Sequence, residues 1–203
     1  MDFNLFSQNS GYLHLILGPM FSGKTTELIR IYNKYTACGI KCLMINHGSD
    51  TRYNNEGHVT SHSKGQIKSL NLIKLNQIDE FSLVNYDVIL INEGQFFSDL
   101  YDIVKMLVDT AKKHVFVCGL DGDFKREKFG QMLDLIPLCD NVVKLKAVCQ
   151  ECKKSDAIYT YRKTNDTQQT IVAEKDMYSA LCRNCYLRCY SGSCLSTSSE
   201  SGF

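Results

Sequence analysis

Residues 18–25 read Gly-Pro-Met-Phe-Ser-Gly-Lys-Thr and match the phosphate-loop motif G-x-x-x-x-G-K-[ST] at every fixed position. The glycines of this motif let successive backbone N–H groups converge on phosphate oxygens, and the following helix points its positive end at the same anion. Lys24 is expected to reach the β- and γ-phosphates, and Thr25 to place its hydroxyl on Mg²⁺. The predicted nucleoside triphosphate site comprises Gly18, Pro19, Met20, Phe21, Ser22, Gly23, Lys24, Thr25 and Thr26.

The sequence on both sides of the motif has the expected pattern. Residues 12–17 form an apolar run typical of a strand, and a helical stripe follows the motif at Leu28, Ile31, Tyr32 and Tyr35. A chance glycine-rich turn is the alternative, and the strand and helix on either side argue against it.

Further along the chain, apolar strands alternate with helices. We predict strands at residues 41–46, 86–92 and 114–118, a helix at 97–112, and a last strand at 141–148 that leads out of the sheet. The run at 86–92 is almost continuously apolar, as expected for a strand buried on both faces of a parallel sheet. The fold class is therefore α/β, a parallel sheet flanked by helices.

Two C-x-x-C pairs, Cys149/Cys152 and Cys182/Cys185, together provide the four thiolates of a tetrahedral Zn²⁺ site. Four thiolates leave no open coordination position, so the predicted zinc is structural. A pair of disulfides is one alternative. Cys189 and Cys194 follow closely and could replace a ligand.

Composition narrows the class of protein. The chain has 203 residues, ten cysteines and a net charge of +1, and it starts without the basic region of a signal peptide. The small net charge argues against a nucleic-acid surface, and no apolar run approaches a membrane span. With a phosphate loop and no export signal, we expect a cytoplasmic enzyme with reduced thiols.

Polar residues follow the buried strand at 86–92. The carboxyl ends of parallel strands line the ligand crevice, so Glu93 is expected near the triphosphate, as a base or as an organiser of magnesium and water. A solvated loop glutamate is the alternative. Asp50 and Arg52 follow the second strand, and Arg52 could neutralise charge on a moving phosphoryl group. By itself this pair is as well explained as surface decoration.

The short motifs of the chain, taken in order, resemble those of one family. They are residues 18–28 (Gly-Pro-Met-Phe-Ser-Gly-Lys-Thr-Thr-Glu-Leu), 50–53 (Asp-Thr-Arg-Tyr), 93–97 (Glu-Gly-Gln-Phe-Phe), 120–124 (Leu-Asp-Gly-Asp-Phe), Phe129-Gly130 and the two C-x-x-C pairs. Their conjunction, from about Gly11 to Tyr186, resembles the zinc-containing thymidine kinases of animals, bacteria and large DNA viruses.

The resemblance implies a domain organisation. An ATP-binding α/β domain would span residues 1–148 and a zinc-binding lasso domain residues 149–190. The lasso itself, about residues 161–181, would close over the nucleoside, and homotetramers would be expected. The serine-rich composition of residues 191–203 indicates a disordered tail.

The resemblance also implies a reaction, transfer of the γ-phosphoryl group of ATP to the 5′-hydroxyl of thymidine. Glu93 would take the proton, Lys24 and Arg52 would hold the phosphates, and Thr25, with Asp50 and Asn92 nearby, would hold Mg²⁺. The implied thymidine-binding residues are Met20, Gln95, Phe96, Leu120, Phe124, Phe129, Thr160 and Tyr178.

Two positions depart from the family pattern. Asn92 stands where the family usually has aspartate, which predicts weaker magnesium binding, and Asp50 could compensate for the lost charge. Ala173-Glu174 replaces a flexible glycine pair in the lasso. Two rival functions therefore remain at the level of sequence: a nucleotide- or nucleoside-binding pseudoenzyme, and an ATPase whose zinc ribbon binds nucleic acid.

Overall fold

A six-stranded parallel sheet forms the centre of the protein in the computed structural model, which describes residues 10–48, 58–60, 66–169 and 175–191. The strand order is β5-β2-β6-β7-β1-β8. The strands are β1 (Tyr12–Leu17), β2 (Cys42–His47), β5 (Leu70–Leu72), β6 (Val88–Ile91), β7 (His114–Gly119) and β8 (Asn141–Lys144). This arrangement confirms the predicted α/β fold.

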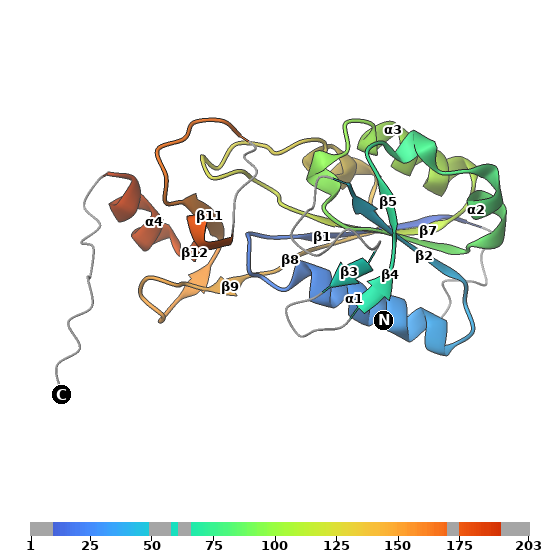
Figure 1. Cartoon of the computed structure of the whole chain (residues 1–203), viewed down its shortest axis with the longest axis horizontal. Helices are drawn as coiled ribbons and strands as arrows, with labels where there is room; N and C mark the ends of the chain where they lie inside the picture. Colours follow the sequence, from blue (N-terminus) through green and yellow to red (C-terminus); the bar gives the residue numbers. More distant parts are fainter. Residues whose placement is uncertain (1–9, 49–57, 61–65, 170–174, 192–203) are drawn as a thin grey trace.

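Helices cover both faces of the sheet (Figure 1). On one face lie α1 (Lys24–Ala37) and a small antiparallel ribbon, β3 (His58–Thr60) with β4 (Gln66–Lys68). The other face carries α2 (Glu80–Asn85), α3 (Leu100–Lys105), the π-helical turn η3 (Met106–Thr110) and the 3₁₀ turns η1 (Leu75–Gln77) and η4 (Leu133–Leu138). Every central strand is therefore buried on two sides.

Strand β1 shows how the sequence achieves this burial. Leu13, Leu15 and Leu17 point into the core under α3, whereas Ile16 points into the core under α1. Successive side chains of a strand alternate between faces, so an unbroken apolar run serves both layers. Gly39, with φ of 76°, terminates α1 after Cys38.

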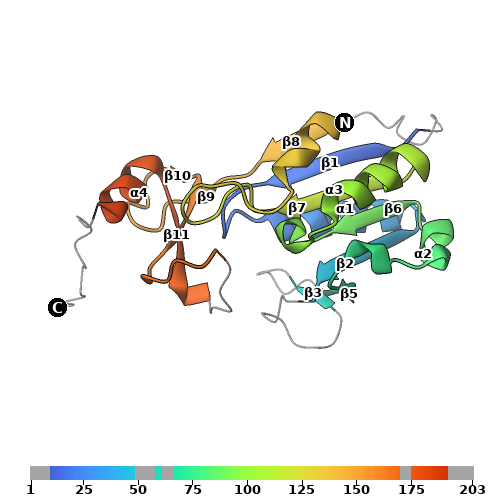
Figure 2. The same cartoon turned by 90° about the horizontal axis from the view of Figure 1, so that it is seen from above.

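Beyond β8 the chain builds a smaller lobe at one end of the sheet (Figure 1; Figure 2). It contains β9 (Ala147–Val148), β10 (Asp156–Ala157), β11 (Tyr159–Arg162), the 3₁₀ turn η5 (Lys175–Met177), β12 (Tyr178–Leu181) and α4 (Arg183–Tyr190). Strands β9 and β10 pair antiparallel, as do β11 and β12. Tyr186 is completely buried in the core of this lobe.

Five predicted segment boundaries need correction, and the first is the strand at 114–118, which extends to Gly119. The predicted strand 41–46 lies one residue later, and 86–92 shortens to Val88–Ile91. The predicted helix 97–112 starts only at Leu100, since Phe97 is extended, and its last turns widen to π geometry, with the Ala111 N–H bonded to Met106 O. The predicted strand 141–148 divides into β8 and β9.

The C-terminal segment and the predicted absence of a membrane span can be compared with the structure. Ser191 closes α4 through its hydroxyl bond to Arg188 O, and residues 192–203 of the predicted tail lie outside the described residues. None of the helices in the described ranges has the length and hydropathy needed to cross a membrane.

Candidate phosphoryl-transfer site

The motif residues 18–25 form a tight loop between β1 and α1. Gly18, Phe21 and Gly23 have positive φ angles of 146°, 65° and 84°. A Cβ on Gly18 would lie 2.6 Å from Leu145 O, so only glycine fits there. The Ser22 hydroxyl donates to Pro19 O at 2.8 Å and holds the loop from inside. The loop thus has the backbone that the motif predicts for enclosing phosphates.

Lys24 is the first residue of α1 and is 9% exposed. Its Nζ donates to Pro19 O at 2.7 Å, so the ammonium group lies against the loop that its own helix follows. An ammonium in this place puts a positive charge where phosphate oxygens would bind.

Asn92 connects this loop to the neighbouring strands. Its Oδ1 accepts from the Thr25 hydroxyl at 3.2 Å and from the Cys118 thiol at 3.0 Å, and its Nδ2 donates to Asn46 Oδ1 at 2.8 Å. Asn46 and Asn92 are 5% and 3% exposed. The ends of β2, β6, β7 and the start of α1 therefore meet at one buried amide.

Glu93 follows directly, in left-handed backbone conformation with φ of 55° and ψ of 43°. A non-glycine residue held in this region costs energy and is common at functional sites. The buried Gln95 fixes the carboxylate, because its Nε2 donates to Glu93 Oε2 at 2.6 Å while its Oε1 accepts from the Leu120 N–H at 3.0 Å. Gln95 thus orients Glu93 and ties it to the residue after β7.

Aromatic side chains gather beside Glu93. Phe96 and Phe129 meet edge to face, with ring centroids 5.5 Å apart, and His47 lies 5.5 Å from Phe96. Gly130 makes this approach feasible, since a Cβ there would lie only 2.2 Å from Gln95 O. Two predicted thymidine-binding aromatic residues are therefore brought together next to the predicted base.

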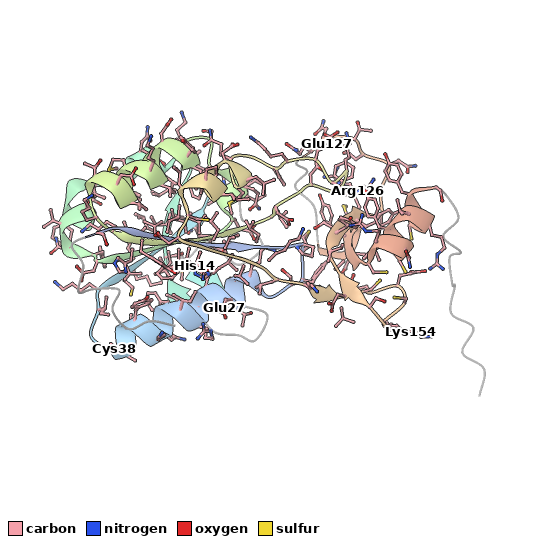
Figure 3. The ribbon with its side chains drawn as sticks, turned by 180° about the vertical axis from the view of Figure 1, so that it is seen from behind. His14, Glu27, Cys38, Arg126, Glu127 and Lys154 are labelled. Carbon is pink, nitrogen blue, oxygen red and sulfur yellow. The ribbon has the colours of Figure 1, made fainter. Side chains whose placement is uncertain are left out.

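The smaller lobe contacts the phosphate loop through Thr160 of β11. The Thr160 hydroxyl accepts a hydrogen bond from the Met20 N–H at 3.0 Å, across 140 residues of sequence. Phe124 lies on the turn formed by residues 121–129, where the Tyr186 hydroxyl donates to Phe124 O at 2.6 Å. Figure 3 labels Arg126 and Glu127 on this turn, between the sheet and the smaller lobe.

The four predicted metal ligands converge in the smaller lobe. The Sγ atoms of Cys149, Cys152, Cys182 and Cys185 all lie within 4.8 Å of one another, and those of Cys152 and Cys182 are 4.0 Å apart. A tetrahedron with Zn–S bonds of about 2.3 Å has sulfur–sulfur edges of about 3.8 Å. The donor set therefore fits Zn²⁺. All four are free cysteines, which contradicts the alternative of two disulfides.

The electrostatic surroundings of these thiols differ. The pKa of Cys152 is lowered to about 6, mainly by a hydrogen bond from the Lys154 N–H. The pKa of Cys185 is raised to about 12, mainly by burial. Arg188 donates to Cys185 Sγ at 3.8 Å and would favour its thiolate. Zinc binds thiolates, so zinc held at this site would favour the deprotonated form of Cys185.

Some predicted site residues fall outside the described part of the chain. Asp50, Arg52 and the Ala173-Glu174 pair lie there, as does Cys194, and Cys189 is not part of the four-sulfur cluster. Among the predicted residues that the structure describes, Thr25 is bonded to Asn92, Glu93 to Gln95 and Met20 to Thr160, and Phe96 contacts Phe129. The four cysteines form a separate cluster in the smaller lobe.

Sequence reasoning missed three buried polar residues around the site: Asn46, Asp123 and Arg162. Asp123 Oδ1 accepts from the N–H groups of Lys125 and Glu127 and shapes the turn that carries Phe124. The signal that could have identified it is the pair of aspartates in the Leu-Asp-Gly-Asp-Phe motif. Nothing in the local sequence marks Arg162 or Asn46.

A parallel sheet, a phosphate-loop motif before its first helix and a carboxylate at the same sheet edge define a phosphate-loop nucleotide-binding protein, here with an added four-cysteine lobe. Comparison with known proteins narrows this class. The thymidine kinase family profile matches residues 11–186. The chain belongs to the thymidine kinase family.

Similar curated proteins come from poxviruses. The chain is 41% identical to the thymidine kinase of vaccinia virus (strain Western Reserve) over 179 residues, which cover 88% of this chain and 98% of that protein. It is 39% identical to the sheeppox virus (strain KS-1) thymidine kinase over 176 residues, covering 87% of this chain and 97% of that protein. Identity to the monkeypox virus thymidine kinase is 40% over 179 residues, with coverage of 88% and 98%. The predicted family is thereby confirmed.

Proposed function

We propose that this protein transfers the γ-phosphoryl group of ATP to the 5′-hydroxyl of thymidine, giving thymidine monophosphate. Family membership supports the reaction. The observation that carries the proposal is the position of Glu93: it follows Asn92, which is hydrogen-bonded to Thr25 of the phosphate loop, and its carboxylate is fixed by Gln95. A base and a triphosphate site thus share one sheet edge.

The nucleotide side of the site uses the phosphate loop. Backbone N–H groups of residues 21–25 would bind phosphate oxygens, and Lys24 would place its ammonium on them. The Thr25 hydroxyl would hold Mg²⁺, with Asn92 behind it; hydroxyl and amide oxygens suit this hard cation. When bound, Mg²⁺ neutralises charge on the phosphate oxygens.

The proton would pass from the 5′-hydroxyl of thymidine to Glu93. Gln95 donates to Oε2 of that carboxylate and so orients the group that would accept the proton. The left-handed backbone at Glu93 sets the direction of the side chain. The hydroxyl oxygen would then attack the γ-phosphorus in line with the departing ADP oxygen.

The nucleoside would bind between the sheet edge and the smaller lobe. Phe96, Phe129 and Phe124 offer aromatic faces for a flat methylated pyrimidine, and Thr160 and Tyr178 lie on the opposing strands β11 and β12. Met20, Gln95 and Leu120 would complete the contacts.

The remaining assignments rest on the resemblance and the chemistry of the residues. Arg52 would hold the moving phosphoryl group and Asp50 would assist at the metal. We propose one structural zinc per chain at the four cysteines, an ATP-binding domain at residues 1–148, a lasso domain at 149–190, and a homotetramer working in the cytoplasm. Light scattering of the purified protein tests the tetramer.

The reaction is tested by following ADP and thymidine monophosphate in the presence of ATP, Mg²⁺ and thymidine. Thymidine-dependent formation of both products supports the proposal. Nucleotide and nucleoside binding without products would indicate a pseudoenzyme, whereas ADP release that nucleic acid stimulates and thymidine does not would indicate an ATPase. Either result overturns the proposal.

Glu93→Gln tests the base. The amide keeps the shape but cannot take a proton, so we expect turnover to fall by roughly a hundredfold to ten-thousandfold, with little change in thymidine binding. Glu127→Gln, on an exposed side chain of the 121–129 turn, is the matched control and should stay near wild type. Wild-type turnover in Glu93→Gln would remove Glu93 from this role.

A further inference from the structure

Arg162, the last residue of β11, has an unusual environment for an arginine. It is only 4% exposed. Removing a guanidinium from water costs several kcal/mol unless its donors are satisfied and its charge is stabilised. The contacts of Arg162 must therefore offset this cost.

All five N–H groups of the guanidinium have acceptors. Nε and Nη2 donate to the Tyr178 hydroxyl at 3.2 and 2.8 Å. The other donors reach three carbonyls of the following segment: Nη1 donates to those of Asp166 (3.1 Å) and Gln168, and Nη2 to that of Gln169 at 2.9 Å. Arg162 therefore joins β12 to residues 166–169.

The same guanidinium lies over the ring of Phe124, with Cζ 3.7 Å from the ring centroid. This cation–π contact is shielded from water and so belongs to the stronger class of such contacts. Gln169 adds a second link, because its Nε2 donates to Asp123 Oδ2 at 2.9 Å. The segment that Arg162 fixes is thus tied to the residue just before Phe124.

We propose that Arg162 is a positioning residue for the nucleoside: it fixes the ring plane of Phe124, the hydroxyl of Tyr178 and the backbone at 166–169 in one arrangement. The inference rests on the proposed function, which places thymidine against Phe124 and Tyr178. Arg162 itself does not touch the reacting atoms. Its effect passes through the groups that bind the base.

Lysine cannot replace arginine here. An ammonium has three donors without a planar fork, and it cannot stack flat on a ring. Arg162→Lys keeps the charge but loses the geometry. We expect KM for thymidine to rise at least tenfold, with KM for ATP and kcat each changing less than threefold and zinc content unchanged.

The matched control is Arg183→Lys. Arg183 belongs to the same lobe and lies over the ring of Tyr159 at 5.2 Å, but it is exposed. It should keep wild-type constants. Combining Arg162→Lys with Phe124→Leu should raise KM no further than the more severe single variant, because both remove the same ring placement. Additive effects, or an unchanged KM in Arg162→Lys, would overturn the proposal.

Hydrogen exchange measured without substrates tests the positioning independently of the reaction. In Arg162→Lys, amides of residues 163–169 and 121–129 should exchange at least tenfold faster, while β1 and β7 stay protected. Equal exchange rejects the inference even if thymidine is phosphorylated. Faster exchange in a protein whose wild type does not phosphorylate thymidine rejects only the proposed reaction.

Arg162→Lys could also lose its zinc or fail to fold. Tyr178→Phe then serves, because it removes the acceptor of two guanidinium N–H groups and keeps the ring. The same faster exchange at residues 163–169 is expected. Wild-type exchange and an unchanged thymidine KM in Tyr178→Phe would refute the positioning role.

Discussion

Asn92→Asp tests how far the magnesium site of this chain follows its family. The change replaces an amide that bonds in three directions: to Thr25 and Cys118 through Oδ1 and to Asn46 through Nδ2. A carboxylate can still accept from Thr25 and Cys118. It has nothing to donate to Asn46, so two oxygens would face each other across the present 2.8 Å contact.

The structure gives the size of the effect. Leaving a buried acceptor unpaired costs about 1–3 kcal/mol, and burying a carboxylate that is only a few per cent exposed adds to this. Rotation of the Asn46 amide by half a turn would restore a donor and recover part of the loss. Without Mg²⁺ we therefore expect Asn92→Asp to lower the free energy of unfolding by about 2 kcal/mol. The near-identical shape of the two side chains does not make the substitution silent.

Magnesium should reverse this loss. A carboxylate behind Thr25 adds a negative charge beside the cation, and a gain of about 1.4 kcal/mol corresponds to a tenfold lower half-saturating Mg²⁺ concentration. We expect Mg²⁺ with ATP to raise the Tm of Asn92→Asp more than that of wild type. Activity titrated against free Mg²⁺ gives the second readout.

Asn46→Asp is the matched control. It adds the same charge to the same hydrogen-bond network, but Asn46 is linked to Thr25 only through Asn92. It should shift the Mg²⁺ requirement less than Asn92→Asp does. The reasoning is refuted if Asn92→Asp is as stable as wild type without Mg²⁺ and needs the same or more Mg²⁺ for activity. That outcome would mean that the network is organised around the amide and that the family's metal geometry does not apply to this chain.

Two further predictions concern the zinc site and the pH dependence of stability. Cys149→Ser should release zinc and abolish thymidine binding while ATP still binds, whereas Cys38→Ser, on an exposed free cysteine, should do neither; an active Cys149→Ser protein without zinc, by elemental analysis, would contradict this. Burial lowers the pKa of His14, which is 7% exposed. The unfolded chain therefore binds the proton more tightly than the folded chain. The contribution of neutral His14 to the free energy of unfolding is fully present above about pH 6.5 and is lost as the pH drops toward the folded pKa. The loss is at most about 1.4 kcal/mol per pH unit for one proton. His14→Phe should flatten the decline of Tm between pH 7 and 5, and an unchanged slope would exclude His14 as its source.

The reason His14 is sensitive is visible in its surroundings. Its ring lies on β1 toward α1 (Figure 3), 5.7 Å from the ring of Phe116, and Nδ1 contacts Asn141 Nδ2 at 3.2 Å. That contact makes Nδ1 the acceptor and places the proton on Nε2, which is buried and has no hydrogen-bond partner in the described part of the chain. A second proton would go to Nδ1, beside the Asn141 amide, and would add charge to a buried site where Glu27 offsets only part of the cost of burial.

The sequence predicted the sheet and the phosphate loop because both depend on local patterns. The apolar run at residues 12–17 and the glycine spacing of the loop are each decided within a few residues. Segment ends were less predictable. The start of α3 depends on Asp99, whose carboxylate accepts from the N–H groups of Leu75 and Asn76 more than twenty positions away.

The missed residues share a physical reason. Asp123 and Arg162 are buried only because Gln169, Tyr178 and Phe124 close over them from distant parts of the chain. In the sequence each looks like an ordinary surface charge, which is where such residues usually lie. Zinc ligands were predictable in contrast, since two C-x-x-C pairs carry their chemistry in their spacing.

Strand β11 joins the two halves of the proposed reaction. Thr160 and Arg162 are two residues apart and so point to the same face of the strand. Thr160 accepts from Met20 in the phosphate loop, and Arg162 stacks on Phe124. The same strand pairs with β12, which runs directly into Cys182. On the proposed assignment, one short strand sets the distance between the triphosphate and the nucleoside, and zinc holds the end of its partner strand. Loss of zinc should therefore impair the alignment of the two substrates more than the binding of ATP, because the residues of the phosphate loop belong to the sheet domain and contact the smaller lobe through Met20 and Phe21.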